Sequence, residues 1–478
     1  MSNKQAISLY PHRPVGINYW KNLCVWLVIL ASLSILLEWI SLYFGYKRYA
    51  ISVEMLLAFF LSSLGFFWLG LLVFSLAISV EIVLGVSSVL FLFDYDQVKT
   101  IVGFIFEAKF EFIVALIIAI NFAVALYLMA NRLLRRIEWQ RTAIVSTFII
   151  LLQVVFSFRD GNFAYPHLSE RSKLIAGSAF YFSKIIMLEN GKVFNLRSQD
   201  NVEYIPVVNP SAVMQTFEKE LQAQGLSNKV LLIVAESWGL PTVSKIFESQ
   251  VDSLIHNKNI TNIEFGEVKA RGATAFGEFR ELCGKVPTKL NLKKISQSDL
   301  GSCFPKRLKE AGYQTISIHG AHGTMYDRLN WYPVLGIDSM IFREILPMAK
   351  DGDCFSFPGY CDKNIFPVVR EKLIENNKIF LYWLTLNSHM PYDKRDIINY
   401  QDGLCASIFQ NGYDERLCNY HLLQKQFFDG LSALAGDKLL SGTEVLVVGD
   451  HPPPLLTNSE PKKYFESESI PFLHFHIK

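Results

Sequence analysis

The sequence lacks any pair of cysteines at the CxxC spacing of a common zinc site, and it has only seven cysteines in 478 residues. It also lacks a basic stripe with interleaved aromatic residues, and its formal net charge is +2, so nothing in it indicates a nucleic-acid partner. What the sequence has in excess is apolar side chains. Hydrophobic residues make up 51% of the chain, which is high for a purely soluble protein.

The apolar excess lies before about residue 160, in runs long enough to cross a bilayer, which takes roughly 20 residues of helix. The first run is long and is followed by further runs instead of a small-residue cleavage site, so it is retained and is not a signal peptide. We therefore predict a multi-pass α-helical membrane domain over residues 1–160. Its five spans lie near Trp20–Tyr43, Ser52–Leu71, Leu72–Phe93, Phe110–Met129 and Ala143–Phe158, with the boundary between the second and third left open.

Basic residues predict the orientation of these spans, because lysine and arginine prefer the cytoplasmic side of short loops. The strongest cluster, NRLLRRIEWQR, contains Arg132, Arg135, Arg136 and Arg141 and lies between the fourth and fifth spans. If this loop is cytoplasmic, everything after Phe158 lies outside the cytoplasm.

Six of the seven cysteines fall in that outer half, and an even number in an oxidising compartment indicates disulfides. Six cysteines allow fifteen pairings, and six free buried thiols remain the alternative. Proximity in the sequence favours the pairs Cys283 with Cys303, Cys354 with Cys361, and Cys405 with Cys418.

The outer half reads as a juxtamembrane connector over 161–227, followed by an α/β domain with a mainly parallel central sheet over 228–478. Short β-rich runs at 230–235, 315–318, 379–386 and 444–448 alternate there with longer amphipathic stretches. Ionisable residues follow these runs, and ligands of open α/β sheets bind outside the carboxyl ends of the strands. We therefore expect one site that contains Glu236, His319, His389, Asp450 and His451.

Glu236, Asp450 and His451 form a set of two carboxylates and an imidazole that suits Zn²⁺, Mn²⁺ or Mg²⁺. Thr274 follows a Gly-Ala pair and opens a segment with helical spacing, where the positive end of the helix dipole favours an alkoxide. Coordination to a metal would lower its pKa further and make it a nucleophile. Taken singly, Thr274 reads as an ordinary helix cap and Glu236 as a solvated acid.

Three segments together resemble a known family: VAESWG around Glu236, GATAFGEF around Thr274, and VVGDH at Asp450 and His451. They are similar to the motifs of the membrane-bound phosphotransferases of the alkaline phosphatase superfamily, such as lipoteichoic acid synthases and lipid A phosphoethanolamine transferases. The resemblance covers roughly Val230 to the C-terminus. It implies an alkaline-phosphatase-like fold in which Glu236, Thr274, Asp450 and His451 bind at least one divalent metal, Zn²⁺ ahead of Mn²⁺ or Mg²⁺.

The segments ISIHGAHGTMYDR and TLNSHMPY resemble the parts of the synthase that contact the phospho head group. The resemblance implies substrate-binding roles for His319, Tyr326, Arg328 and His389, with tyrosine where the synthase has tryptophan. An arginine can grip a phosphoryl oxygen bidentately, and histidines can exchange protons with phosphate oxygens or alcohols. Two departures lie near this pocket, Ala321 in place of an acidic residue and the prolines that follow His451.

By this resemblance the protein is a multi-pass enzyme of the bacterial inner membrane, with its catalytic domain on the periplasmic or extracellular side. It transfers the head group of a phospholipid to a hydroxyl of an envelope glycan or lipid through a phospho-threonine. Of the two candidate head groups, phosphoethanolamine from phosphatidylethanolamine is preferred slightly over phosphoglycerol from phosphatidylglycerol.

Several alternatives stay open. Water could replace the acceptor, which would make the protein a phosphodiesterase. A catalytically inactive membrane scaffold or sensor is the alternative from another class. Sulfatases of the same superfamily mature a cysteine or serine in a C/S-x-P-x-R motif, and Cys283, followed by GKVP, does not have that spacing.

Overall fold

The chain forms two compact units, the N-terminal helices and the elements from β1 onward. The computed structural model describes residues 18–44, 53–90, 110–134, 140, 142–149, 151, 203–223, 225–270, 274–287, 292, 295–346, 354–357, 359–390, 392–400, 403, 405–409, 413, 415–453 and 464–478.

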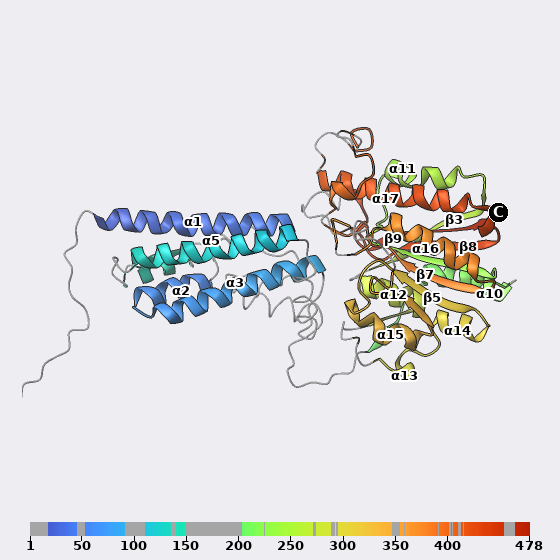
Figure 1. The fold of residues 1–478 in the computed structure, drawn as a ribbon, viewed down its shortest axis with the longest axis horizontal. Helices are drawn as coiled ribbons and strands as arrows, with labels where there is room; N and C mark the ends of the chain where they lie inside the picture. Colours follow the sequence, from blue (N-terminus) through green and yellow to red (C-terminus); the bar gives the residue numbers. More distant parts are fainter. Residues whose placement is uncertain are drawn as a thin grey trace, which may run out of the picture. The chain divides into compact units, whose positions relative to one another are not determined.

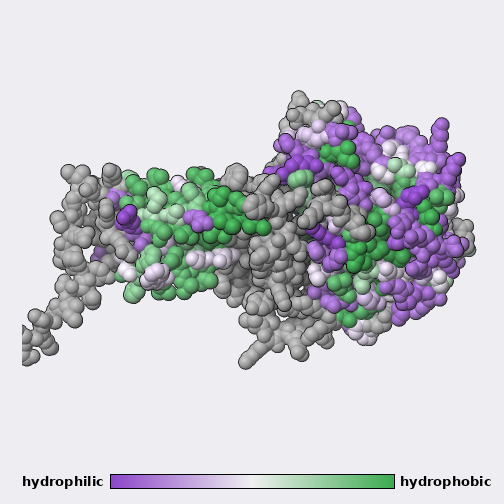
Figure 2. Space-filling model, in the orientation of Figure 1, coloured by the Kyte–Doolittle hydropathy of each residue, from purple (hydrophilic) through white to green (hydrophobic). Residues whose placement is uncertain are grey.

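The first unit consists of long helices that pack around aromatic side chains. They are α1 (Asn18–Phe44), α2 (Val53–Ser63), α3 (Phe67–Leu90) and α5 (Phe110–Leu134). Buried rings of Phe59, Phe74 and Tyr127 stack where α2, α3 and α5 meet, with centroids 4.7 to 5.8 Å apart. Figure 2 shows hydrophobic residues over the visible face of these helices. Within the described ranges, no helix combines the length and hydrophobicity that crossing a bilayer requires.

The predicted apolar run from Ser52 to Leu71 is divided between two helices. The break falls at Leu64 to Phe66, where Gly65 adopts φ +94° and its N–H donates to the carbonyl of Ser62. A left-handed glycine after the last turn is a common helix stop. The boundary that the sequence left open between the second and third runs is thus a helix break at residues 64–66 in the structure. Of the fifth predicted run, residues 143–149 and 151 are helical, and the remainder lies outside the described residues.

The second unit is built on a seven-stranded sheet that confirms the predicted mainly parallel α/β class. In spatial order it contains β3 (Ile260–Lys269), β9 (Ser469–Ile477), β8 (Thr443–Gly449), β2 (Lys229–Ala235), β7 (Ile379–Leu384), β5 (Gln314–His319) and β6 (Ser339–Ile341). The strands from β8 to β6 pair in parallel, whereas β9 is antiparallel to both of its neighbours. A small antiparallel pair, β1 (Tyr204–Pro206) with β4 (Lys285–Pro287), lies apart from this sheet.

Helices cover both faces of the large sheet (Figure 1). On one face, β2 residues Leu231 and Ile233 belong to a core with α11 (Ser244–Ile255), α16 (Asp362–Glu375) and α17 (Glu415–Ala435). On the other face lie α10 (Phe217–Ala223), α12 (Thr274–Cys283) and α14 (Phe304–Glu310), where the ring of Phe304 contacts that of Phe380 on β7. Strands covered on both faces need apolar residues at successive positions, which is why the central runs are unbroken.

The three predicted disulfides are all present: Cys283–Cys303, Cys354–Cys361 and Cys405–Cys418. The first joins the last residue of α12 to the residue that precedes α14, and the second holds the residue that precedes α16. Both disulfides therefore fix the ends of helices that lie next to the sheet.

Candidate active site

The four predicted strands are adjacent in the sheet, in the order β8, β2, β7, β5. Because they are parallel, their carboxyl ends meet at one edge. Glu236 directly follows β2, Asp450 and His451 directly follow β8, His319 ends β5, and His389 lies five residues beyond β7. The expected convergence at one edge is therefore found.

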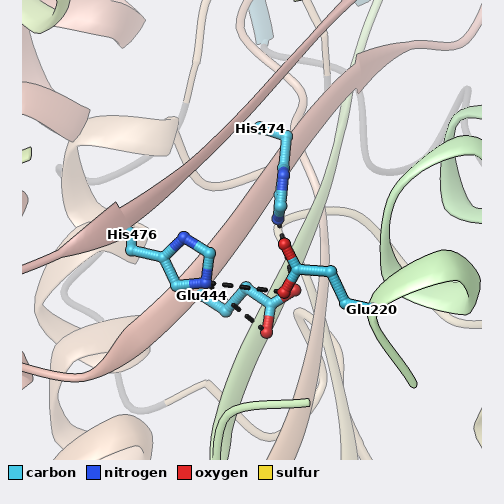
Figure 3. Close-up of side chains that lie close together, drawn as sticks. All are labelled: Glu220, Glu444, His474 and His476. Atoms are coloured by element: carbon cyan, nitrogen blue, oxygen red, sulfur yellow. Dashed lines mark hydrogen bonds and ion pairs between the residues drawn. The ribbon is translucent and has the colours of Figure 1, made fainter. Parts of the chain in front are cut away.

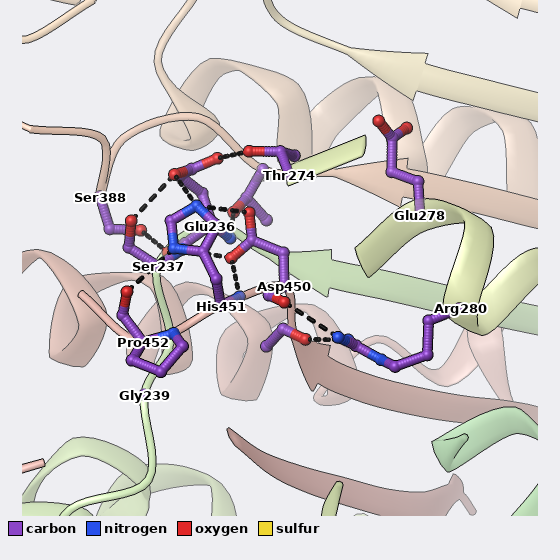
Figure 4. A network of polar contacts seen from close by, with 12 residues as sticks. Glu236, Ser237, Gly239, Thr274, Glu278, Arg280, Ser388, Asp450, His451 and Pro452 are labelled. Carbon is purple, nitrogen blue, oxygen red and sulfur yellow. Dashed lines mark hydrogen bonds and ion pairs between the residues drawn. The ribbon is translucent and has the colours of Figure 1, made fainter. Parts of the chain in front are cut away.

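Glu236, Asp450 and His451 form a compact buried cluster, shown in Figure 4, whose ligand-type atoms all lie within 4.8 Å of one another. The Nε2 atom of His451 lies 3.3 Å from Oδ2 of Asp450 and 3.6 Å from Oε1 of Glu236. The hydroxyl of Thr274 donates to Oε2 of Glu236 at 3.2 Å. At most 7% of any of these four residues is exposed.

The hydrogen bonds of the cluster fit a bound divalent cation. Asp450 accepts two backbone N–H bonds on Oδ1, from Ser237 and His451, while its Oδ2 is buried without a hydrogen-bond partner. The Nδ1 atom of His451 lies 2.9 Å from the carbonyl of Pro452. A carbonyl can only accept, so Nδ1 carries the proton and Nε2 keeps the lone pair that a metal requires.

Electrostatics point the same way. Burial and the neighbouring charge of Glu236 raise the pKa of Asp450 to about 6, because two carboxylates repel each other in a site that water does not screen. A bound cation would offset this repulsion. The donor set of two carboxylates and one imidazole suits zinc and also accepts manganese or magnesium.

Thr274 is the first residue of α12, so its side chain lies at the helix end that carries partial positive charge. The close approach of α12 to β8 depends on glycine. A Cβ added at Gly277 would lie 2.9 Å from both Cα and Cβ of Asp450, and one added at Gly449 would lie 2.0 Å from the carbonyl oxygen of Trp238. These two glycines let three backbone segments meet at the site.

Gly277→Ala is expected to displace Asp450 and to lower metal affinity about 10- to 100-fold, the usual size of a disturbance behind the ligands. Titration of zinc into the purified protein, followed by calorimetry, measures this. Gly430→Ala is the matched control, since its Cβ would lie 2.5 Å from the ring of Phe366 on the far side of the domain. Equal metal affinity in both variants would contradict the role given to Gly277.

Several residues that position the cluster were not predicted from the sequence. Ser237, with φ 57°, donates its hydroxyl to Oε1 of Glu236. Arg280 donates from Nη1 and Nη2 to the carbonyls of Asp450 and Gly449, at 3.0 and 2.8 Å, and thereby holds the end of β8. No spacing rule indicated Arg280, because a residue six positions after Thr274 lies on a different side of the helix.

His319 and His389 have the same hydrogen-bond pattern as His451. Their Nδ1 atoms lie 3.0 Å from the carbonyl of Leu384 and 2.8 Å from that of Met390, so each Nε2 keeps its lone pair. Burial lowers the pKa of both, that of His389 to about 4. The charges of His451 and Asp450 act on His389, which lies beside the cluster. Both rings are therefore neutral near pH 7, because burial disfavours the charged imidazolium.

Arg328 is buried and lies in an ion pair. Its Nε and Nη2 donate to Glu278 on α12, the latter at 2.8 Å, and its Nη1 donates to the carbonyl of Met325. Tyr332 and Tyr382 also donate to Glu278. Figure 4 shows the Glu278 side chain apart from the Glu236, Asp450 and His451 cluster. The structure thus places Arg328 in a buried network that the sequence did not reveal.

Tyr326 joins this network to the cluster. The guanidinium carbon of Arg328 lies 5.1 Å from the centre of the Tyr326 ring, and the charges of Glu236 and Asp450 act on its hydroxyl. Burial raises its pKa, so the phenol stays protonated. Its φ of 53° is uncommon for a tyrosine, and strain of this kind gathers at functional sites.

One stretch outside the cluster does match the sulfatase motif C-x-P-x-R: residues 303–307, CFPKR. The sequence alone therefore does not dismiss a sulfatase. In the structure Cys303 forms a disulfide with Cys283, the last residue of α12. Thr274 begins the same helix, and nine helical steps separate the two ends by about 13 Å. Cys303 is thus neither free nor placed as a nucleophile for the cluster.

Comparison with known proteins gives one family match. The sulfatase family model matches residues 229–473, slightly more than half of the chain. A search of curated proteins found no match.

Similar solved structures include the lipoteichoic acid synthase LtaP from Listeria monocytogenes, at 18% identity and TM-score 0.41 over 52% of this chain and 65% of that one. The Streptococcus pyogenes phosphoglycerol transferase GacH is similar at 15% identity and TM-score 0.38, over 58% of this chain and 78% of that one. The periplasmic domain of EptC from Escherichia coli, in complex with Zn, is similar at 14% identity and TM-score 0.38, over 53% of this chain and 73% of that one. The chain spans less than two thirds of the length of the Listeria structure.

The family match covers the strands of the large sheet from β2 to β8 and the first part of β9, together with the cluster at the edge of the sheet. It confirms the superfamily that the three sequence motifs indicate. The chain belongs to the sulfatase family.

Proposed function

We propose that the protein transfers a phospholipid head group to a hydroxyl of an envelope glycan or glycolipid through a covalent phospho-Thr274. Phosphoethanolamine remains the preferred head group, ahead of phosphoglycerol. The observation that carries the proposal is the hydrogen bond from the Thr274 hydroxyl to Glu236, inside a buried set of metal-type donors at a helix N-terminus. A hydroxyl in such surroundings is prepared for attack on phosphorus.

In the first step Oγ1 of Thr274 attacks the phosphorus of the lipid while its proton passes to Glu236, 3.2 Å away. The bond from phosphorus to the diacylglycerol oxygen breaks, and diacylglycerol leaves with a proton. A divalent cation bound at the cluster would lower the pKa of the threonine hydroxyl and offset negative charge on the phosphoryl oxygens.

In the second step the acceptor hydroxyl attacks phosphorus, and the bond to Thr274 breaks. The lone pair on Nε2 of His389 suits this step, because the acceptor hydroxyl must lose a proton. Diacylglycerol carries away the proton that Thr274 gave to Glu236, and the oxygen of Thr274 takes up the proton that the acceptor gave to His389. Donor and acceptor thus exchange one head group for one proton. We propose that His319, the last residue of β5, and Tyr326 contact the head group.

The donor is a membrane lipid, either phosphatidylethanolamine or phosphatidylglycerol, and we propose that five membrane spans before residue 160 keep the domain at the bilayer surface. Apolar composition of the first third of the chain supports this, and so do the three disulfides, which form in oxidising compartments. The proposed location is the bacterial inner membrane, with the catalytic domain outside the cytoplasm.

The covalent intermediate gives a direct test. The full-length protein, purified in detergent, is mixed with vesicles containing phosphatidylethanolamine or phosphatidylglycerol and no acceptor, then quenched and digested. Mass spectrometry is expected to find the Thr274 peptide carrying one phosphoethanolamine, or one phosphoglycerol with the other lipid. The Asp450→Asn/His451→Gln variant is the control and should remain unmodified. If the wild-type peptide stays unmodified with both lipids, the covalent mechanism is wrong.

A further inference from the structure

A second group of metal-type side chains lies at the opposite end of β8. Glu444 is the second residue of this strand, whereas Asp450 follows its last residue. Six residues of extended chain separate the two carboxylates by about 20 Å, at roughly 3.3 Å per residue. The group is therefore distinct from the cluster that contains Thr274.

The sheet register and one helix bring the group together. On β9, Glu444 pairs with His476, and the next position on the same face is His474, beside Leu446. Successive residues of a strand point to opposite faces, so the two histidines and Glu444 share one face. Glu220 on α10 faces them from above the sheet, and Figure 3 shows the four side chains converging.

The distances approach those of a metal site. Nε2 of His474 lies 3.2 Å from Oε1 of Glu444, and Nε2 of His476 lies 3.6 Å from Glu220 and 3.9 Å from Oε2 of Glu444. All four ligand-type atoms lie within 4.8 Å of one another. Ligands 2.0 to 2.1 Å from a tetrahedral zinc are about 3.3 Å apart, so small side-chain movements would complete the tetrahedron.

Burial and charge favour a cation there. Glu444 and His474 are almost fully buried, and about a fifth of the side chains of Glu220 and His476 is exposed. In the part of the chain that the structure describes, no lysine or arginine forms an ion pair with either glutamate, although their carboxylates meet. The Nδ1 atom of His476 is also buried without a hydrogen bond. Two carboxylates this close together, one of them fully buried, need a compensating positive charge.

The surroundings resemble the support of a structural metal. Oε2 of Glu444 accepts the backbone N–H of Ser227 at 3.1 Å, which fixes the carboxylate. The ring of Phe217, the first residue of α10, meets that of His474 edge to face at 5.6 Å. Such outer partners orient ligands and exclude water.

We infer that Glu220, Glu444, His474 and His476 bind a second divalent ion, zinc being the best match, which fastens α10 to strands β8 and β9. Four protein ligands leave no open position, which is typical of structural zinc and not of a catalytic centre. The ion takes no part in the proposed transfer, so this site stands whether or not that function holds.

Counting metal in the full-length protein tests the site. Zinc-loaded and desalted wild type is expected to hold two zinc ions per chain by mass spectrometry of the elements. The Glu220→Gln/His476→Gln variant and the Asp450→Asn/His451→Gln variant should hold one each. The exposed pair of His256 with Asp252 supplies the control, and its His256→Gln variant should still hold two.

Two further readouts separate a metal site from plain ion pairs. Cobalt added to the Asp450→Asn/His451→Gln variant should give the visible absorption of a tetrahedral ion, and zinc should raise its melting temperature by several degrees. Adding Glu220→Gln to that variant should abolish both responses. Because the Glu220 side chain is partly exposed, its replacement should leave the fold intact. Two ions retained after Glu220→Gln/His476→Gln, or no second ion in wild type, would overturn the inference and leave histidinium–glutamate pairs in its place.

Discussion

Replacing Thr274 by alanine is expected to lower head-group transfer at least about 10³-fold, because the variant has no oxygen to attack phosphorus. The phosphorylated peptide should disappear, while the metal content stays unchanged, since Glu236, Asp450 and His451 remain in place. Transfer of a labelled head group from lipid vesicles to an isolated envelope fraction measures the rate, and elemental analysis measures the metal.

Thr274→Ser is the matched control for this prediction. It keeps the hydroxyl and the hydrogen bond to Glu236, so substantial transfer and a modified peptide are expected. If Thr274→Ala transfers head groups at a rate within tenfold of wild type, the covalent route is wrong. If wild type holds no stoichiometric metal and the variant changes nothing in the envelope, the protein is a scaffold or sensor.

Glu278→Gln is expected to cost about 3 to 5 kcal/mol of unfolding free energy, because it leaves the guanidinium of Arg328 buried without its counter-charge. Both side chains are at most 1% exposed, and Glu278 also accepts from two tyrosines. For a domain of this size such a loss lowers the melting temperature by on the order of 10 °C. Thermal unfolding of the purified protein measures it.

The control is the exposed pair of Lys425 with Asp429, 2.9 Å apart on α17. Asp429→Asn should cost less than about 1 kcal/mol, since water screens such pairs. Equal melting temperatures for Asp429→Asn and Glu278→Gln would refute the structural role. The double variant Glu278→Met/Arg328→Leu should recover most of the stability, and its transfer rate then reports whether Arg328 also contacts the phosphoryl group.

The site could be predicted from the sequence to the extent that it depends on strand ends. Unbroken apolar runs mark buried strands, and parallel strands bring Glu236, His389 and Asp450 to one edge whatever the details of packing. The partner of Arg328 follows no such rule. Glu278 lies fifty residues earlier, and only the packing of α12 near the start of α15 (Arg328–Leu335) brings the two together.

The second metal-type group could not be predicted from the sequence for a related reason. His474 and His476 have the spacing of two residues on one face of a strand, but neither the antiparallel register with Glu444 nor the position of α10 can be deduced from that spacing. The helix break at Gly65 was missed because residues on both sides of it are equally apolar, so hydropathy does not change there.

Strand β9 makes the sheet depend on residues that follow the whole catalytic cluster in the sequence. It is the last strand along the chain, yet it lies inside the sheet, and in the described residues β3 pairs with no other strand of that sheet. A chain that stopped before Ser469 would carry every residue of the catalytic cluster but would leave β3 without a partner and the core without Leu473 and Phe475. We therefore expect the cluster around Thr274 to be assembled only after the residues of β9 have left the ribosome, and chains that stop before Ser469 to be inactive and open to proteolysis.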